Sequence, residues 1–400
     1  MIDRPPTSSR LLALRRALRE GRSIAELRAL SPAVQDLATD EAQATFVDAI
    51  VLDPITARFP PNPRLRFRVL SDVSAALVDA GHAVDERLLE ALSTASMLAR
   101  RCGGGADAPL CWRTFEISDG LHVATRTQAS WGGKSETGHD VWGAGQTFAR
   151  WLAQRAIDAT CDGGAADNAL VFPRDRPCNV IELGSGTGIA GIALALAAAQ
   201  RTECDLRVAC TDIAGVVPNL RFNIEANGFA AASDDGVVPP CANSSCVGAR
   251  LDWEEVAQSA ADEDAAATWG AALPFEPADV DVIIGSDLVY NPELHHPLLT
   301  VVTRLLRPSG AARARTQKRK RKRKFLMMSA VRSRATRQHF VTSLAEFSLA
   351  SRTLWSHSSA VATSLSDCGD RAGESFVARA DEIHGCVDMD LLLIECAESR

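Results

Sequence analysis

The sequence predicts an α/β protein in which a mostly parallel sheet carries helices on both faces, preceded by an N-terminal helical domain and a β-hairpin. From residue 179 onward, apolar segments of strand length alternate with helical patterns, and this alternation is typical of βαβ units. The first hundred residues instead carry apolar side chains at helical spacing. A chain of 400 residues is long enough for two or three domains.

The first hundred residues predict a series of short helices. Ser23 and Glu26 have the spacing of a capping box, which marks a helix start. The segment 58–64 holds three prolines, which remove backbone donors and must interrupt any helix. We therefore expect residues 1–105 to form a helical domain that helps to recognise a large folded partner, and residues 106–400 to form the second domain.

The predicted strands follow a loop rich in glycine. Residues 112–117 and 121–126 flank Ser118-Asp119-Gly120, a sequence typical of a hairpin turn because glycine tolerates positive φ. A helix is expected over residues 141–152. The strands of the sheet are then expected within 179–186, 207–212, 247–253, 279–287, 324–331 and 388–396.

Composition excludes several classes of protein. The longest apolar run, Ile189–Ala199, is about half of the ~20 residues that a membrane-spanning helix needs, and no secretory signal is visible. The 11 cysteines form no CxxC pair, so we expect reduced thiols and no metal site in a cytoplasmic protein. The chain is acidic, with a net charge of −7, except for seven consecutive basic residues at Lys318–Lys324. That run indicates either a solvated loop or a nuclear-localisation patch.

The clearest motif is an apolar strand that runs into Gly184, Gly186 and Gly188 and then into an alanine-rich helix. Glycines at such a turn let the backbone approach a ligand closely, which suits any nucleotide-like cofactor. The GxGxxG spacing that starts at Gly186 also fits a dinucleotide site. Glu182, two residues before the first glycine, would repel a pyrophosphate and favours a ligand with a cationic amino group and a sulfonium.

Acidic residues are expected at the ends of the next two strands. Asp212 follows the second strand, where a carboxylate can accept hydrogen bonds from both hydroxyls of a ribose. Asp252 and Trp253 end the third strand, where the acid can accept from an exocyclic amine and the indole can cover an adenine. Each residue alone has a structural explanation, as an N-cap or a core side chain, but acids at three successive strand ends favour a ligand site.

The fourth strand ends in Ser286-Asp287-Leu288-Val289-Tyr290, and Tyr290 is the only tyrosine of the chain. In a doubly wound sheet, a second substrate meets the cofactor at such strand ends. Asp287 is expected to hold an incoming ammonium group, and Tyr290 to pack against its alkyl chain.

In their order, the segments ELGSGTG, TD, LDW and DLVY resemble the seven-strand S-adenosylmethionine-dependent methyltransferases, and DLVY fits the Asp/Glu-x-x-Tyr/Phe motif of their protein-lysine group. Residues 137–152 resemble the segment of that group that lines the methionine end of the cofactor. Three further features are similar to the elongation factor 2 lysine methyltransferase subfamily. They are the helical N-terminal extension with its Pro-Pro break and the segments WRTFEI and LDWEEV. The DLVY motif differs from the Asn-Pro-Pro-Tyr of amide and adenine methyltransferases, which disfavours a nucleic-acid substrate.

The resemblance implies a Rossmann-like sheet of seven strands, S-adenosylmethionine as cofactor, a monomer, and methyl transfer to a lysine of a large protein, elongation factor 2. The catalytic residues would be Asp287 and Tyr290. The residues expected to bind the cofactor are Trp142, Glu182, Gly184, Gly186, Gly188, Asp212, Asp252 and Trp253. Two alternatives stay open: a non-catalytic binding protein that retains the fold, and a methyltransferase that acts on RNA or small molecules.

Overall fold

The computed structural model of the chain forms two compact units. It describes residues 7–101, 110–128, 138–158, 176–201, 205–229, 244–259, 273–307, 323–357 and 388–397. The first unit consists of Met1–Glu116 with His122–His139, and the second of Ile117–Leu121 with Asp140–Arg400.

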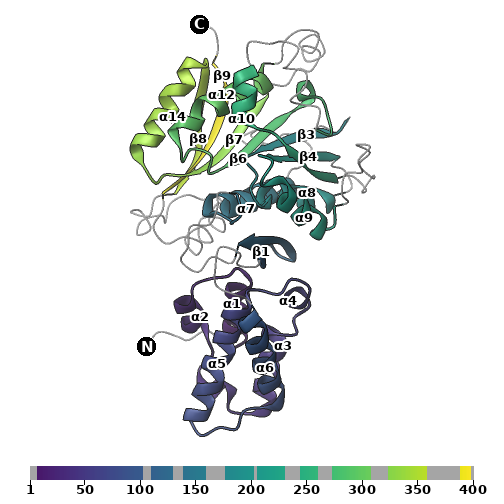
Figure 1. Cartoon of the computed structure of the whole chain (residues 1–400), viewed down its shortest axis with the longest axis vertical. Coiled ribbons are helices and arrows are strands. Elements are labelled where there is room, and N and C mark those ends of the chain that lie inside the picture. The colour runs from purple at the N-terminus through teal and green to yellow at the C-terminus, as the bar shows by residue number, and fades with distance from the viewer. Residues whose placement is uncertain are drawn as a thin grey trace. The chain divides into compact units, whose positions relative to one another are not determined.

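The first unit begins with a bundle of short helices (Figure 1). Their bounds are α1 Thr7–Arg19, α2 Ile24–Leu30, η1 Val34–Leu37, α3 Asp40–Ile50, α4 Pro54–Arg58, α5 Pro63–Asp79 and α6 Glu86–Arg101. The expected capping box is confirmed, because the Ser23 side chain accepts from the N–H of Glu26 and the Glu26 side chain accepts from the N–H of Ser23. The proline-rich break is also confirmed, since α4 ends before it and α5 begins at its last proline.

A β-hairpin packs on these helices. Strands β1 (Leu110–Ser118) and β2 (Leu121–Gln128) form a two-stranded sheet joined through Gly120, whose φ is 76°, so the predicted hairpin is confirmed. The ring of Trp112 lies edge-on to Phe59, with 4.9 Å between the ring centroids. Most of the hairpin therefore groups with the helices, whereas the sequence assigned it to the second domain. The domain boundary after residue 105 stays a prediction.

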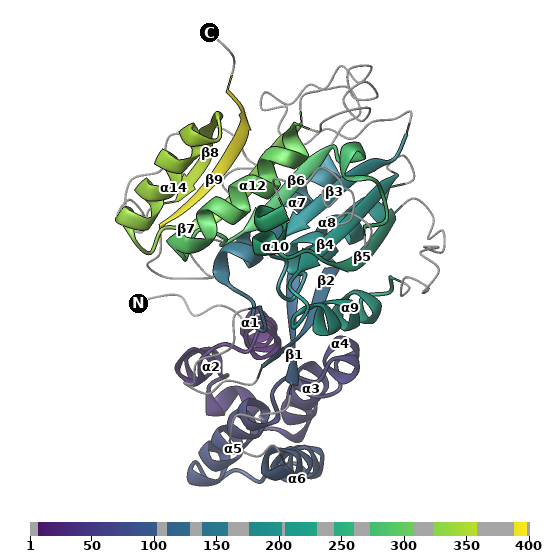
Figure 2. The same cartoon turned by 45° about the horizontal axis from the view of Figure 1, so that its top comes forward.

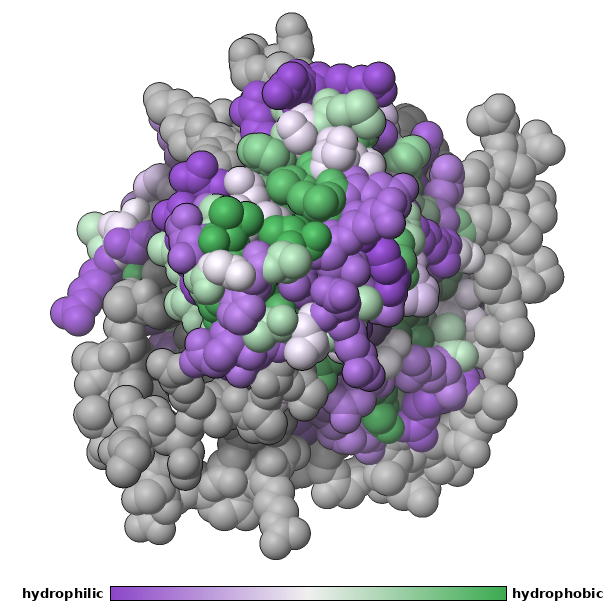
Figure 3. All heavy atoms as spheres, turned by 90° about the horizontal axis from the view of Figure 1, so that it is seen from below, coloured by the Kyte–Doolittle hydropathy of each residue, from purple (hydrophilic) through white to green (hydrophobic). Residues whose placement is uncertain are grey.

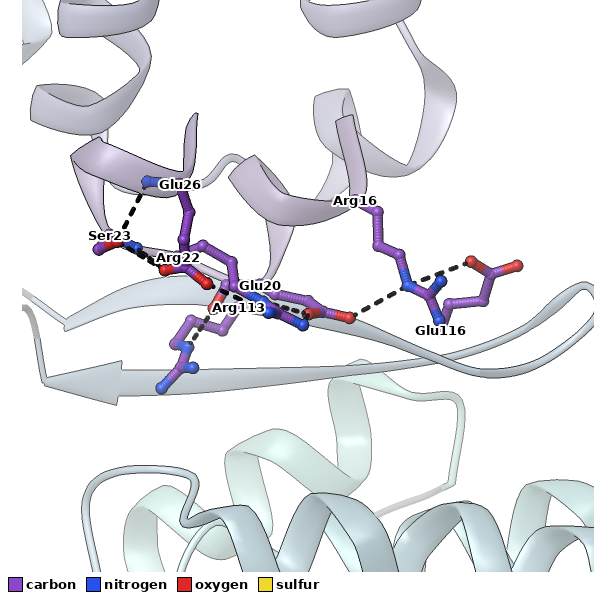
Figure 4. A network of polar contacts seen from close by, with 7 residues as sticks. All are labelled: Arg16, Glu20, Arg22, Ser23, Glu26, Arg113 and Glu116. Atoms are coloured by element: carbon purple, nitrogen blue, oxygen red, sulfur yellow. Dashed lines mark hydrogen bonds and ion pairs between the residues drawn. The ribbon is translucent and has the colours of Figure 1, made fainter. Parts of the chain in front are cut away.

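A network of charged side chains joins the hairpin to the end of α1 (Figure 4). The carboxylate of Glu20 is almost fully buried and accepts hydrogen bonds from Arg16 and Arg22. Arg113 of β1 donates from Nε to the carbonyl oxygen of Glu20 at 2.7 Å, and Arg16 lies 3.7 Å from the carboxylate of Glu116. These contacts fix the register of β1 against the helices.

The face of the protein seen in Figure 3 shows apolar residues surrounded by hydrophilic ones. In the helical part of the first unit, several large apolar side chains are exposed rather than buried in the core. They are Leu12, Leu52, Val78, Leu89, Met97 and Leu98.

The second unit is built on a seven-stranded sheet (Figures 1 and 2). Its strands are β3 Cys178–Leu183, β4 Leu206–Asp212, β5 Ser244–Arg250, β6 Val282–Ser286, β7 Lys324–Ala330, β8 Leu349–His357 and β9 Met389–Cys396. Their order is β5-β4-β3-β6-β7-β9-β8, and only β9 runs antiparallel to its neighbours. The chain reverses its direction of winding at β3, so the carboxyl ends of β3, β4 and β6 meet at the place where such sheets bind ligands.

Helices cover both faces of this sheet, which confirms the predicted fold class (Figure 2). Their bounds are α7 Gly143–Asp158, α8 Ile189–Ala199, α9 Val217–Ala226, α10 Trp253–Gln258, α12 His295–Leu306 and α14 Arg334–Glu346, with the short turns η3 Pro277–Asp279 and η4 Pro292–Leu294. Leu298 of α12 and Phe340 of α14 share one apolar cluster with Ile283 and Phe325 of the sheet, whereas α8 packs on the opposite face against Cys210. No helix in the described ranges has the length and apolarity needed to cross a membrane.

Three local expectations were wrong. Strand β8 was missed because four of its first five residues are exposed, which is typical of an edge strand and leaves no apolar pattern. Strand β5 ends at Arg250, so Asp252 and Trp253 begin a helix rather than end a strand. Lys324 is the first residue of β7 and not part of a connection; residues 318–322 lie outside the described part of the chain.

Candidate active site

The loop from Gly184 to Gly188 connects β3 to α8 at the carboxyl edge of the sheet. All three of its glycines have positive φ, at 58°, 54° and 83°, and Gly188 is the N-cap of α8. A Cβ atom on Gly184 would lie 2.7 Å from Leu288 and 3.2 Å from the indole of Trp253. Both the backbone conformation and the close packing of Leu288 and Trp253 therefore require glycine at residue 184.

Asp212, the last residue of β4, lies against this loop. Its Oδ2 accepts from the N–H of Gly186 at 2.7 Å, and its Oδ1 accepts from the N–H of Ile213 at 2.8 Å. The carboxylate is partly exposed at the end of β4. It is thus fixed by two backbone bonds while it still faces solvent, which suits an acceptor for ligand hydroxyls.

Glu182 is buried between the sheet and α8, where Ser185 of the loop also reaches its carboxyl. It is 1% exposed, and its Oε2 accepts from the N–H of Gly191 at 3.2 Å. Burial raises the pKa of Glu182 to about 7 and the charge of Asp212 adds to this, while hydrogen bonds from Cys210, Ser185 and the Gly191 N–H act in the opposite direction. A direct contact of Glu182 with a cofactor stays a prediction; what the structure contains is a carboxyl that anchors the first turn of α8.

Asp252 and Trp253 have different roles in the structure. The Asp252 side chain accepts from the backbone N–H groups of Glu254 and Glu255, so it is the N-cap of α10. Trp253 is partly buried, and its ring reaches the glycine loop at Gly184. Asp252 is therefore engaged in the helix start, and the role of Trp253 as a wall for an adenine stays a prediction.

Asp287 follows β6 in a strained conformation. Its φ is 58°, which few residues other than glycine adopt and which often marks a functional position. Its N–H donates to the carbonyl oxygen of Met328 on β7 at 2.8 Å, and its side chain is 9% exposed. The backbone thus fixes the carboxylate at the tip of the strand next to the glycine loop.

The partner of Asp287 is Arg332, which the sequence analysis missed. Its Nη1 donates to Oδ1 at 2.8 Å and its Nη2 to Oδ2 at 2.5 Å, which is a two-pronged ion pair. The guanidinium carbon lies 5.2 Å from the ring centroid of Trp142, a half-exposed residue just before α7. Arg332 stands two residues after β7, and its place beside the carboxyl end of β6 was the one signal that could have identified it.

Tyr290 is half-exposed and lines a cavity together with Arg332. Burial raises the pKa of Tyr290 above the usual value, and the charges of Asp212 and Asp287 add to the shift. The cavity has a volume of about 60 Å³. Its lining residues are Val289, Tyr290, Ser329, Ala330, Val331, Arg332, Ser333, Thr336 and Arg337.

The structure therefore brings together the glycine loop, Asp212 and Trp253 on one side, and Asp287, Arg332 with Trp142, and Tyr290 on the neighbouring strand end. Within the described ranges, no group of three or more metal-ligating side chains occurs.

Residues 125–261 match the model of a family described as lysine methyltransferase. The matched segment contains the glycine loop, Asp212 and Trp253, and ends before Asp287 and Arg332.

Three curated relatives are similar to the chain. Protein N-lysine methyltransferase METTL21A of Mus musculus is 27% identical over 41% of this chain and 54% of its own length. Ribosomal lysine N-methyltransferase 5 of Eremothecium gossypii is 32% identical over 48% and 63%. Protein-lysine N-methyltransferase EEF2KMT of Homo sapiens is 25% identical over 70% and 71%. The matches to the first two thus span less than two thirds of those proteins. Together with the family match, they confirm the resemblance to protein-lysine methyltransferases.

Proposed function

We propose that this chain, which matches the lysine methyltransferase family over residues 125–261, is an S-adenosylmethionine-dependent protein-lysine N-methyltransferase whose substrate is elongation factor 2. The observation that carries the proposal is the fixed carboxylate of Asp287 at the strand end next to the glycine loop. In this proposal the cofactor binds at the glycine loop and the cationic side chain at Asp287, so that the two substrates are adjacent, as transfer between them requires.

The residues at the loop fit an adenosyl cofactor. The partly exposed carboxylate of Asp212 provides an acceptor for ribose hydroxyls, and the ring of Trp253 beside Gly184 provides an apolar wall. S-adenosylmethionine supplies a methyl group on a sulfonium, which an amine can accept. Trp142 and the loop would hold its methionine end.

The lysine side of the site has to position a neutral amine. A lysine with a pKa near ~10.4 is almost entirely charged at neutral pH. Asp287 would hold the ammonium group, and Tyr290 would pack against the alkyl chain. Partial burial there favours loss of the proton to water, so positioning of the amine about 3–3.5 Å from the methyl carbon supplies most of the rate and no obligate general base is needed.

Elongation factor 2 is supported as the substrate by the length of the alignment with one relative. The relative named EEF2KMT aligns with 70% of this chain, well beyond the family match. The helical unit exposes several large apolar side chains, which a large protein partner could contact. We propose that the reaction takes place in the cytoplasm and that the enzyme is a monomer.

The test is transfer of label from tritiated S-adenosylmethionine to purified elongation factor 2, to total RNA and to the small molecules of a lysate, in parallel. We expect label in a lysine of the factor alone. Asp287→Asn should abolish transfer while S-adenosylhomocysteine still binds, because asparagine tolerates the positive φ of this position.

Glu293→Gln, an exposed acid nearby, is the matched control and should transfer normally. Label in RNA or in a small molecule would favour the second alternative. Cofactor binding without any transfer would favour a non-catalytic protein.

A further inference from the structure

Asp287, the residue expected to hold the lysine ammonium group, is already occupied. Both of its carboxylate oxygens accept from the guanidinium of Arg332, at 2.8 and 2.5 Å. An ammonium group cannot take the same position with the same bonds while Arg332 remains there. The arrangement is therefore one acid with two competing cations.

Asp287 and Arg332 differ in how exposed their side chains are and in how firmly the fold holds them. Asp287 is 9% exposed and is fixed by its backbone bond to Met328, whereas the side chain of Arg332 is 44% exposed. The guanidinium of Arg332 lies over the ring of Trp142, which is itself 48% exposed. The acid is thus held by the fold, whereas the side chain of Arg332 reaches solvent and can move aside when another cation takes its place.

We propose that Arg332 is a gate on the amine subsite, which closes Asp287 in the free protein and is displaced by the target lysine through exchange of one ion pair for another. This inference rests on the proposed function and adds a residue that sets specificity. The exchange conserves charge, because one cation replaces another. It replaces a two-pronged guanidinium pair by an ammonium, so it is unfavourable unless the rest of the substrate also binds.

Two consequences follow from this competition. A free amine or a short peptide gains little binding energy elsewhere and is excluded, whereas a docked protein can offset the exchange. The displaced guanidinium stays tethered to the residues after β7, close to the amine. Its positive charge there favours the neutral form of the amine, which is the form that reacts.

The decisive comparison is Arg332→Ala against Arg334→Ala, which removes the same charge two residues further on, at the start of α14 and outside the ion pair. With purified elongation factor 2 and a short lysine peptide as substrates, Arg332→Ala should lower KM about three- to tenfold for the peptide and less for the protein. The kcat should change less than KM. Arg334→Ala should leave both values unchanged.

A second measurement does not depend on methyl transfer. Binding of n-butylamine, which represents the lysine side chain, is followed by NMR titration in the presence of S-adenosylhomocysteine. Arg332→Ala should bind it about three- to tenfold more tightly than the unaltered protein. Arg332→Gln, which keeps most of the side-chain volume, repeats the test if the alanine variant unfolds.

Three results in the Arg332 variants would overturn the proposal of a gate: a higher KM, weaker amine binding, or a loss of kcat at constant KM. Arg332 would then be a residue that orients Asp287. Tighter amine binding without methyl transfer by the unaltered protein would uphold the gate and defeat the proposed function.

Discussion

Gly191 and Glu182 are in direct contact, with the N–H of the glycine bonded to the buried carboxyl at 3.2 Å. A side chain at residue 191 would have its Cβ 2.6 Å from Oε2 of Glu182 and 2.4 Å from Sγ of Cys210. The first turn of α8 can therefore approach the sheet only because residue 191 is glycine, and this approach fixes the end of the cofactor loop.

Gly191→Ala should destabilise the protein by about 1–3 kcal/mol, the usual cost of overpacking a close-packed site. Urea unfolding measures the change as a lower midpoint. Gly215→Ala is the matched control, because a Cβ there meets no atom within 4 Å, and it should leave the midpoint unchanged. Equal midpoints for both variants would contradict the close approach.

The buried carboxyl of Glu182 makes stability depend on pH. Its pKa is about 7 in the fold against an ordinary value of 4.5, so the fold prefers the protonated form. Below pH 4.5 the carboxyl is protonated in both the folded and the unfolded state, so Glu182 does not lower the stability. As the pH rises from 4.5 to 7 the unfolded state loses the proton first, and the free energy of unfolding falls. Above pH 7 it is lower by about 3 kcal/mol. Glu182→Gln cannot ionise. Relative to the unaltered protein, its free energy of unfolding should therefore rise between pH 4.5 and 7, and a constant difference over that range would refute the raised pKa.

Asp212 is expected to bind the ribose of the cofactor while it holds Gly186. Asp212→Ala should weaken S-adenosylmethionine binding by about 1–3 kcal/mol, because ligand hydroxyls lose a charged acceptor. Calorimetry measures the affinity. Asp205→Ala, just before the opposite end of β4, is the control and should bind the cofactor normally. Unchanged affinity of the Asp212 variant would remove the ribose assignment.

The basic run should separate into two parts with different roles. Arg323 donates from Nη1 to the carbonyl oxygen of Leu305 at 2.5 Å and from Nη2 to that of Ala278, so it joins the end of α12 to β7. Arg323→Ala should cost about 1 kcal/mol of stability. Replacement of residues 318–322 by a Gly/Ser linker should leave thermal unfolding and catalytic rate unchanged. Imaging of the chain fused to a fluorescent protein tests the other possibility. If the fusion is nuclear and the replacement moves it out of the nucleus, the run is a localisation signal.

The sequence was sufficient for the parts of the site that depend on backbone geometry. The glycine loop and the acid at the end of β4 follow from strand periodicity and from residue types that a tight turn demands, and the structure has them in contact through Asp212 and Gly186. Side-chain partners across strands could not be derived. Arg332 is 45 residues from Asp287 along the chain, and only the pairing of β6 with β7 makes them neighbours.

The burial of individual side chains could not be predicted from the sequence either. Glu182 has the position expected of a ligand-facing acid, but the alternation of side chains along β3 turns it toward α8, while Ile181 and Leu183 enter the opposite core. Strand β8 escaped detection because an edge strand needs few apolar residues.

Strand β9 occupies the position between β7 and β8, although it comes after both along the chain. While the protein is being synthesised, β8 therefore has no neighbour in the sheet until the residues of β9 have emerged, and the edge of β7 stays open for the same time. The sheet is complete only when β9 has paired with both β7 and β8. Loss of β9 alone would consequently detach β8 as well and leave the open edge of β7 free to pair with another chain.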